Sequence, residues 1–332
     1  MSNRGDIIYD VVIIGAGPTG LFAAFYAGLR GLRAKVIEAL PVVGGQLTIL
    51  YPEKYIYDCP GYPKILAKDL VKNLYEQALT FNPTFVLEER VVNVKPISGG
   101  IIQIDTEKNT HFGRTLLIAA GIGAFSPNKL NIPGAERFEG KGLYYFVKEK
   151  SQFKNKSVLI VGGGDSAVDW ALNLKDYARK VTLIHRRDVF RAHESNVAEL
   201  FKSNVDVKLF YELKSIHGKE RVEGATIFNN KTNEETFLSV DDIIIQIGHK
   251  ADFSFIKNWG LEINSKGVKV NGRMETNITG IFAAGDIADP IDSVKINLIA
   301  VGFAQAAIAI NVIKKRLDPL APLYEHSSEK RL

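Results

Sequence analysis

Two segments of the chain share one arrangement of apolar and polar positions. Residues 11–24 read VVIIGAGPTGLFAA and residues 159–171 read LIVGGGDSAVDWA, so in each an unbroken apolar run leads into glycines. A short apolar run without alternation is typical of a strand buried on both faces of a parallel sheet. After the glycines, apolar side chains recur at helical spacing. The pattern therefore predicts an α/β fold with two copies of strand, glycine loop and helix.

Two stretches without charged residues, Val11–Leu29 and Ile296–Ile313, are long enough to raise the question of a membrane span. Glycines and a proline interrupt the first, which fits strand, turn and helix better than a spanning helix. Amide side chains interrupt the second, which we expect to be a helix buried between packed layers. The opening residues, MSNRGD, include an acid and do not resemble a secretory signal. We expect no membrane segment and a cytoplasmic location.

Composition adds three constraints. A length of 332 residues is more than one hydrophobic core usually serves, which predicts two domains. Cys59 is the only cysteine, which excludes an internal disulfide, a CxxC redox pair and a cysteine-ligated iron–sulfur cluster. The net charge of +5 suits an acidic protein partner, because charge fields steer encounters. We expect no nucleic-acid partner and, because the six histidines show no ligand spacing, no metal site.

The first glycine loop carries the residues that a dinucleotide needs. Gly15 permits a tight turn, Gly17 lets the backbone approach a pyrophosphate, and Gly20 lets the helix pack closely on the strand. The helix N-terminus, which includes Thr19, offers N–H groups to the phosphates. Glu38 ends the next strand, where a carboxylate accepts hydrogen bonds from a ribose 2′-OH. A purely structural turn does not explain Glu38, so this segment predicts dinucleotide binding.

The second glycine loop differs from the first at the end of the following strand. Gly162, Gly164 and Ala167 occupy the three glycine positions, and His185 stands where Glu38 stands in the first copy. Arginines follow at once, and guanidinium groups bind phosphate through paired hydrogen bonds, whereas an acid would repel a 2′-phosphate. We therefore expect NADPH here; a solvated basic strand end is the alternative. The predicted NADPH-binding residues are Gly162, Gly164, Asp165, Ser166, Arg186, Arg187 and Arg191.

The two loops thus predict two different cofactors. The loop that ends in an acid suits the ADP half of FAD, and the loop that ends in arginines suits NADPH. Together they predict hydride transfer from nicotinamide C4 to flavin N5, in which the cofactors supply the redox chemistry and the protein supplies alignment. The scheme requires no acid, base or nucleophile, so no catalytic residue is assigned.

The remaining landmarks predict how the domains are connected. Residues 115–125 and 241–252 each read as an apolar strand that runs into a glycine-rich crossing. We expect these crossings to join two Rossmann-like domains and to act as a swivel. The FAD domain is then discontinuous, comprising residues 1–121 and 249–332, and the NADPH domain, residues 122–248, is inserted between its parts. Residues 276–289, TNITGIFAAGDIAD, resemble the segment that completes the FAD domain in flavoproteins that bind two dinucleotides.

With both loops, the HRRDVFR run and the GIFAAGD segment, the chain resembles the thioredoxin-reductase branch of the pyridine-nucleotide flavoproteins over nearly its whole length. Thioredoxin reductases carry a CxxC just before the second glycine loop, but residues 140–164 contain no cysteine. Thiolates are the nucleophiles of disulfide exchange, so thioredoxin reduction by that route is excluded.

A narrower resemblance is carried by residues 44–65, 162–172 and 185–194, which are similar to the thioredoxin-reductase-like ferredoxin–NADP reductases. These are homodimeric flavoproteins without redox cysteines. The resemblance implies that Tyr51 stacks on one flavin face, and that Asp286 receives a ribityl hydroxyl. It implies FAD contacts from Glu38, Gln46, Tyr51, Val91, Phe125 and Asp286. The tail, residues 323–332, resembles an extension whose aromatic or histidine ring covers the other flavin face, which implies His326 for that ring and Ser328 as a further FAD contact.

The sequence therefore predicts an FAD-dependent ferredoxin–NADP reductase, a homodimer with an acidic ferredoxin as partner. Residues 148–156 and 314–316 are basic segments that suit such a partner. The alternatives are an NADPH oxidase, an NADPH reductase of another small acceptor such as a quinone, and, outside the enzymes, a nucleotide-sensing flavoprotein.

Overall fold

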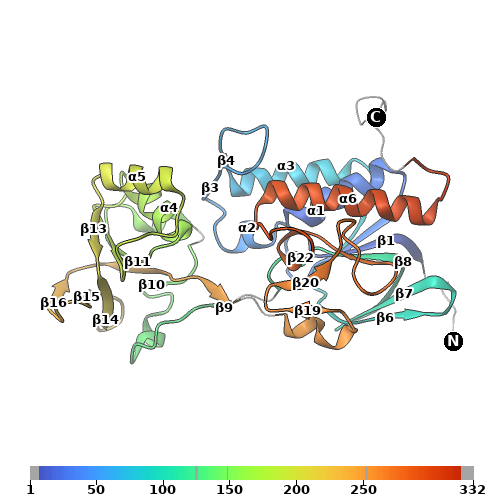
Figure 1. The fold of residues 1–332 in the computed structure, drawn as a ribbon. Coiled ribbons are helices and arrows are strands. Elements are labelled where there is room, and N and C mark those ends of the chain that lie inside the picture. The colour runs from blue at the N-terminus through green and yellow to red at the C-terminus, as the bar shows by residue number, and fades with distance from the viewer. Residues whose placement is uncertain (1–6, 124–125, 148, 251–252, 323–332) are drawn as a thin grey trace. The chain divides into compact units, whose positions relative to one another are not determined.

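The computed structural model describes residues 7–123, 126–147, 149–250 and 253–322. Contacts within the chain divide it into two units (Figure 1). The first unit comprises Met1–Ile49, Tyr55–Ala124 and Ala251–Leu332, and the second comprises Leu50–Lys54 and Phe125–Lys250. The first glycine loop belongs to the first unit, and the second glycine loop belongs to the second.

The first unit is built on a seven-stranded sheet. Its strands follow the order β5-β2-β1-β8-β7-β6, and β21 also pairs with β8. The strands around β1 are parallel, whereas β6 and β7 are antiparallel to their neighbours. The strand bounds are β1 Ile8–Ile14, β2 Ala34–Ile37, β5 Thr84–Val86, β6 Val91–Ile97, β7 Ile101–Thr106, β8 Thr110–Ile118 and β21 Ile281–Ala283.

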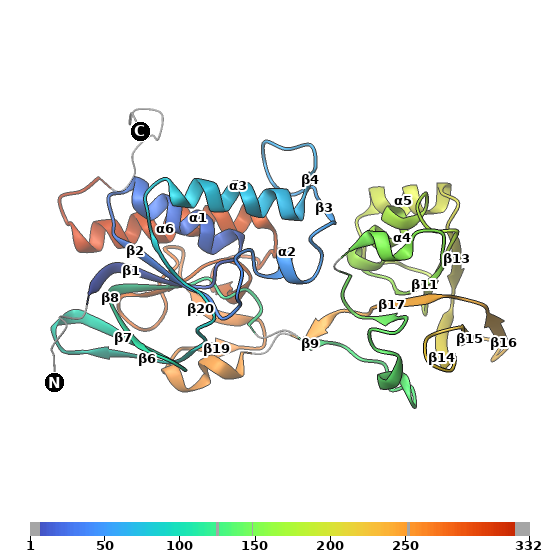
Figure 2. The same cartoon turned by 180° about the vertical axis from the view of Figure 1, so that it is seen from behind.

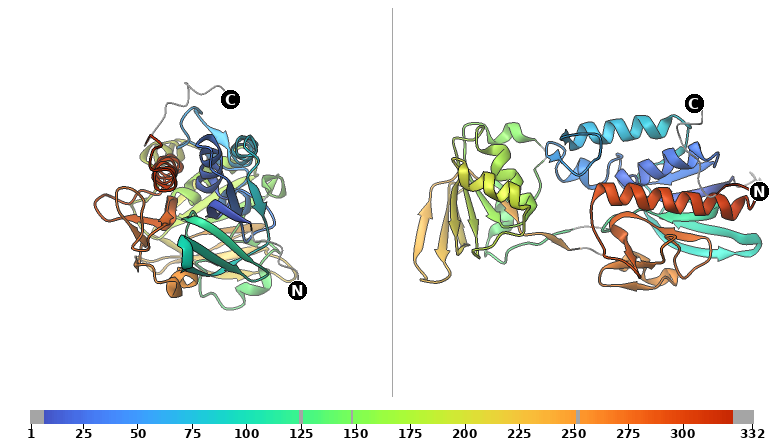
Figure 3. Two further views of the ribbon diagram at one scale, coloured as in Figure 1. Left: turned by 90° about the vertical axis from the view of Figure 1, so that its right-hand side faces the viewer. Right: turned by 45° about the horizontal axis from the view of Figure 1, so that its top comes forward.

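Three helices lie side by side on one face of this sheet, α1 packing between α3 and α6 (Figures 1 and 3). They are α1 Pro18–Leu29, α3 Ala67–Leu79 and α6 Ile299–Leu317. Small buried residues, among them Ala23, Ala24 and Ala27, allow α1 to approach its neighbours closely. The shorter elements are α2 Gln46–Ile49, β3 Tyr55–Ile56, β4 Ile65–Leu66, β19 Ile263–Asn264, β20 Gly267–Val270 and β22 Ala288–Pro290.

The second unit contains a five-stranded parallel sheet in the order β10-β17-β11-β12-β13 and an antiparallel sheet, β14-β15-β16 (Figure 2). Every residue of β11 is buried, as its unbroken apolar run predicts. The strand bounds are β10 Leu143–Tyr144, β11 Ser157–Gly162, β12 Lys180–His185, β13 Asp206–Leu209, β14 Tyr211–His217, β15 Gly224–Asn229, β16 Glu235–Leu238 and β17 Asp242–Gln246. The helices are α4 Asp165–Leu174 and α5 Glu194–Lys202.

Two short strands lie next to the points where the chain passes from one unit to the other. They are β9 Ser126–Pro127 and β18 His249–Lys250, which pair antiparallel inside the second unit. The chain changes unit just before β9 and just after β18, a few residues beyond each predicted domain boundary. The sequence did not predict that Leu50–Lys54 would group with the second unit. In the described ranges, no helix combines the length and the apolar character needed to cross a membrane.

Candidate functional site

The first glycine loop connects β1 to α1. At its first residue, Gly15, the backbone has a conformation that only glycine adopts without strain. Gly15 has a φ of +101°, and a Cβ added there would lie 2.5 Å from the carbonyl oxygen of Ala119. A Cβ on Gly20 would lie 1.9 Å from the Gly15 carbonyl oxygen, so the helix requires glycine to sit this close to the strand. A Cβ on Gly17 meets no atom within 4 Å. The open face of Gly17 at the start of α1 therefore leaves room for a phosphate group.

The carboxylate of Glu38 is held beside this loop. Glu38 follows β2 and is 7% exposed, and its Oε2 accepts the backbone N–H of Ala16 at 2.7 Å. Its Oε1 accepts the N–H of Leu40 at 3.0 Å. An ionised carboxylate has about four acceptor positions, so this one keeps capacity for the hydroxyls of a ribose.

Thr19, at the start of α1, contacts a segment that is distant in the sequence. A Cβ added to Gly285 would lie 2.7 Å from Thr19 Oγ1, and one added to Gly302 would lie 2.3 Å from the same atom. Gln305 in α6 accepts the N–H of Gly285 through Oε1 at 2.7 Å. The GIFAAGD segment and the start of α6 are thereby held against the first glycine loop.

Asp286 lies in this segment and is partly buried. Burial raises its pKa, the Asp58 carboxyl adds to that effect, and Lys295 together with a hydrogen bond from Gln46 opposes it. Lys295 donates to the backbone oxygen of Asp286 at 2.5 Å and to the backbone oxygen of Lys266. Burial lowers the pKa of Lys295, while Asp286 opposes that shift. The structure therefore brings together Gln46 and Asp286, two residues that the sequence placed at the FAD site.

Asp58 is a further residue of this region that the sequence did not predict. Its Oδ2 accepts the backbone N–H of Ile299, the first residue of α6, at 2.7 Å. A carboxylate at a helix N-terminus satisfies an otherwise unpaired N–H group and is stabilised by the helix dipole. No motif in the sequence distinguishes Asp58 from other acidic residues.

The second glycine loop connects β11 to α4 in the same way. A Cβ on Gly162 would lie 2.2 Å from the carbonyl oxygen of Gln246, whereas one on Gly164 meets no atom within 4 Å. Ala167 replaces the third glycine and is fully buried. Asp165 begins α4, and its Oδ1 accepts the backbone N–H of His193 at 2.9 Å.

The three predicted arginines follow β12 on the surface. Arg186, Arg187 and Arg191 are all exposed, and no carboxylate of the described residues forms an ion pair with them. The backbone N–H of Arg191 donates to the carbonyl oxygen of Gly163 in the second loop, and unpaired guanidinium groups suit an anion such as the 2′-phosphate of NADPH.

Comparison with known proteins identifies the family of this chain. Residues 9–309 match the model of the pyridine nucleotide-disulphide oxidoreductase family. The chain belongs to this family. Its α/β fold with two Rossmann-like dinucleotide-binding domains, and its assignment as an enzyme of this oxidoreductase family, are thereby confirmed.

Curated relatives cover nearly the whole chain. One from Bacillus cytotoxicus, named ferredoxin–NADP reductase 2, is 48% identical over 97% of this chain and 97% of its own length. One from Sulfolobus acidocaldarius, named ferredoxin–NADP reductase 1, is 51% identical over 96% of this chain and 98% of its own length.

Solved structures of thioredoxin reductases share the fold. The Lactococcus lactis enzyme in its FR conformation is similar with a TM-score of 0.80 and 29% identity, over 94% of this chain and 100% of that one. The enzyme from T. acidophilum gives a TM-score of 0.82 and 26% identity, over 93% and 98%. Within the family, this chain differs from an enzyme that uses a cysteine pair, because Cys59 is its only cysteine. That cysteine is buried, and burial, with the nearby Asp58 carboxyl, raises the pKa of its thiol.

Tyr51, the predicted flavin-stacking residue, does not group with the first-loop residues. It belongs to Leu50–Lys54, which groups with the second unit, and it packs against the core around Trp170. Lys54 Nζ lies 2.5 Å from Asp169 Oδ2 within the same unit. The stacking role of Tyr51 stays a prediction.

The other predicted FAD contacts are placed in part. Val91 begins β6 and is buried. Phe125, His326 and Ser328 lie outside the described residues.

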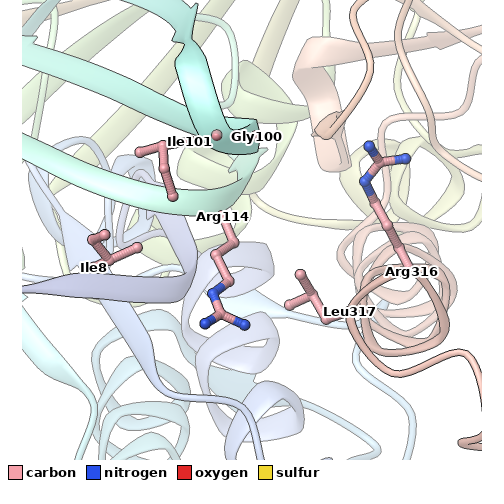
Figure 4. Close-up of a pocket in the computed structure, with 7 residues that line it drawn as sticks. Ile8, Gly100, Ile101, Arg114, Arg316 and Leu317 are labelled. Carbon is pink, nitrogen blue, oxygen red and sulfur yellow. The ribbon is translucent and has the colours of Figure 1, made fainter.

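A cavity of about 550 Å³ lies elsewhere in the first unit, between the start of β1 and the end of α6. Figure 4 shows the side chains of Arg114 and Arg316 at its wall, with the two guanidinium groups projecting in different directions. Ile8 begins β1 and Leu317 ends α6, so this cavity is at the opposite end of those elements from the glycine loop. Because its charged groups do not converge, it is not a candidate for the cofactor site.

Proposed function

We propose that this chain is a ferredoxin–NADP reductase that transfers electrons between NADPH and ferredoxin through FAD. The observation that carries the proposal is a pair of unlike dinucleotide loops in a chain with a single cysteine. Relatives of nearly equal length with 48% and 51% identity carry that name. In the overall reaction, one NADPH and two oxidised ferredoxins give NADP⁺, two reduced ferredoxins and one proton, or the reverse.

The residues of the first loop fit FAD. Gly17 leaves an open face for the pyrophosphate, and Glu38 keeps acceptor positions for the ribose hydroxyls. Asp286 is a partly buried carboxyl group with a raised pKa, and a hydroxyl donor such as a ribityl group would stabilise its ionised form. When bound, FAD accepts a hydride from the nicotinamide and passes electrons singly to an acceptor.

The residues of the second loop would bind NADPH. Gly164 and Ser166, at the start of α4, would bind the pyrophosphate, and the exposed Arg186, Arg187 and Arg191 would bind the 2′-phosphate. These residues bind and orient the nicotinamide nucleotide, and hydride transfer requires no proton from a side chain. We therefore assign no acid–base residue.

The proposal includes the acidic ferredoxin partner, the homodimer and the cytoplasmic location that the sequence predicts. Among the basic segments expected to contribute to docking, Lys156 is paired with Asp242 at 2.8 Å and Lys314 with Asp318 at 3.4 Å. Paired lysines contribute less to a long-range field than unpaired ones, so in residues 149–156 and 314–316 we place more weight on the basic side chains that form no ion pair with a described carboxylate.

The test is anaerobic addition of NADPH to the purified protein, followed by an assay of ferredoxin-dependent cytochrome c reduction. We expect the flavin absorbance to bleach, and the rate with ferredoxin to exceed the ferredoxin-free rate many-fold. A flavin that stays oxidised would indicate a nucleotide sensor. Bleaching without stimulation by ferredoxin would indicate an NADPH oxidase or a reductase of another small acceptor.

A variant without thiols completes this test. Cys59→Ala should retain the ferredoxin-dependent rate, because the scheme uses no sulfur chemistry, and Cys59 is buried with a raised thiol pKa. Loss of turnover in a variant that still folds and binds flavin would contradict the proposed electron path.

A further inference from the structure

His185 stands at the position that corresponds to Glu38 in the first unit, and it contacts the second glycine loop directly. A Cβ built on Gly163 would lie 2.2 Å from both Cε1 and Nδ1 of His185, so the imidazole is seated on the Cα of Gly163. Gly163 does not have a positive φ, and its backbone conformation is open to other residues. Glycine is therefore required at this position by the space that the ring occupies.

Two further contacts hold the ring in place. The ring stacks on Phe190 with a centroid distance of 5.0 Å and an interplanar angle of 28°. His185 Nε2 lies 3.1 Å from the backbone oxygen of Val189, and because a carbonyl oxygen only accepts, Nε2 carries the proton. Burial lowers the pKa of His185; the bond to Val189 opposes this, and the adjacent Arg187 reinforces it, which favours the neutral imidazole at neutral pH.

These contacts close residues 186–191, which we call the arginine segment, onto the glycine loop. His185, which directly precedes the segment, lies on Gly163, and its Nε2–H donates to the backbone oxygen of Val189 within the segment. At its end, the backbone N–H of Arg191 donates to the carbonyl oxygen of Gly163 at 2.7 Å. Both ends therefore meet at Gly163, and the guanidinium groups that the segment carries are exposed.

We propose that His185, seated on Gly163, is the positioning residue that gives the second loop its preference for a 2′-phosphorylated nucleotide. The imidazole fills the place where the first loop has a carboxylate, so a ribose 2′-OH finds no acceptor of that kind. It also holds the arginine segment closed, which orders the backbone of the arginines before the nucleotide arrives. This inference rests on the proposed function, because it assumes that the second loop binds NADPH.

The test measures nucleotide binding to the purified holoprotein by calorimetry, with 2′,5′-ADP and 5′-AMP as probes. His185→Ala should weaken 2′,5′-ADP about tenfold, the effect of losing one hydrogen bond and the ring packing, and change 5′-AMP less than about twofold. Gly163→Ala should give the same selective loss, because its methyl group displaces the ring. The double variant should be no worse than either single variant, since both remove the same contact.

Two variants serve as controls. His217→Ala removes an exposed histidine of the same unit at the end of β14, away from the glycine loop, and should leave both affinities within about twofold. His185→Phe keeps the ring but loses the bond to Val189, and should recover part of the affinity for 2′,5′-ADP. If Gly163→Ala does not fold, His185→Ala and His185→Phe still test the inference.

Arg186→Ala/Arg187→Ala separates the two possible failures. If that variant loses affinity for 2′,5′-ADP while His185→Ala and Gly163→Ala retain it, the inference is wrong and the proposed NADPH site stands. If the arginine variant binds 2′,5′-ADP as well as the unchanged protein does, both the site and the inference are wrong. An equal loss of 2′,5′-ADP and 5′-AMP in His185→Ala would also overturn the inference, because it would show a general role in folding.

Discussion

The two glycine loops of this molecule begin alike and differ in one coupled pair of residues. In the first loop, the middle residue Ala16 donates its N–H to Glu38 at 2.7 Å. In the second loop, the middle residue Gly163 lies directly under the ring of His185. The Glu38 carboxylate accepts the backbone N–H of Ala16 and leaves room for the Ala16 methyl group, whereas the His185 imidazole covers the Cα of Gly163. The difference teaches that the residue at the strand end and the size of the loop residue beneath it have to match.

A second difference lies at the third glycine position. In the first loop, a Cβ on Gly20 would lie 1.9 Å from a backbone oxygen, which cannot move without displacing the strand. The second loop accommodates Ala167 at the corresponding position in a fully buried environment. The first helix is therefore the more closely packed of the two on its strand.

The largest effect is expected from Gly20→Ala. The added methyl would clash with the Gly15 carbonyl oxygen, so the protein should lose more than about 2 kcal/mol of stability and be purified with little flavin. Flavin content and thermal melting measure this. Gly272→Ala is the matched control, because Gly272 is an exposed residue outside the glycine loop and its added methyl meets no atom within 4 Å. Normal flavin content and melting in Gly20→Ala would show that the two loops are equally tolerant.

The second-largest effect concerns the cofactor preference of the second loop. Arg186→Ala/Arg187→Ala should raise the KM for NADPH about 100-fold, the loss of two charge-assisted hydrogen bonds, and the KM for NADH less than about threefold. Steady-state assays with both nucleotides measure the difference. Equal increases for NADPH and NADH would place the 2′-phosphate site elsewhere and remove the contrast between the loops.

A smaller effect is expected in the first loop from Glu38→Gln. Gln keeps one oxygen for the Ala16 N–H but replaces the other acceptor with a donor, so FAD should bind about tenfold more weakly. Titration of the apoprotein with FAD gives the dissociation constant. Glu88→Gln is the control and should bind FAD unchanged, because Glu88 is exposed and meets this region only through its backbone N–H, which donates to the Leu40 carbonyl oxygen at 3.1 Å. Unchanged affinity in Glu38→Gln would show that the carboxylate only orders the loop.

The smallest effect is a pH dependence confined to the second loop. Burial lowers the pKa of His185 below its ordinary 6.5, so the unfolded chain binds the proton more readily than the folded protein. The stabilising contribution of this group is complete above pH 6.5 and decreases as the pH falls toward the lowered value. Thermal melting measured from pH 8 to pH 5 should show this decrease in stability in the unchanged protein and in His193→Ala. It should be absent in His185→Phe. Parallel curves for all three would contradict the neutral, buried imidazole.

The site was predictable from the sequence wherever its residues are close in the chain. A strand, a glycine loop and a helix follow one another directly, so Gly15, Gly20 and Gly162 have the close contacts that their positions predict. The arginine segment was predictable for the same reason, because it follows the second strand of its unit. The roles of these residues toward the cofactors stay predictions, as do the domain bounds.

The sequence by itself determined the α/β fold, the two dinucleotide loops and the absence of a cysteine pair, because local spacing and residue type are sufficient for each. Only the tertiary structure decided which distant residues meet. It placed Thr19 against Gly285 and Gly302, Asp58 at the start of α6, and the segment Leu50–Lys54 with the second unit. It also seated His185 on Gly163. These contacts join residues far apart in the chain, and they depend on how side chains fill space between packed elements, which no local pattern encodes.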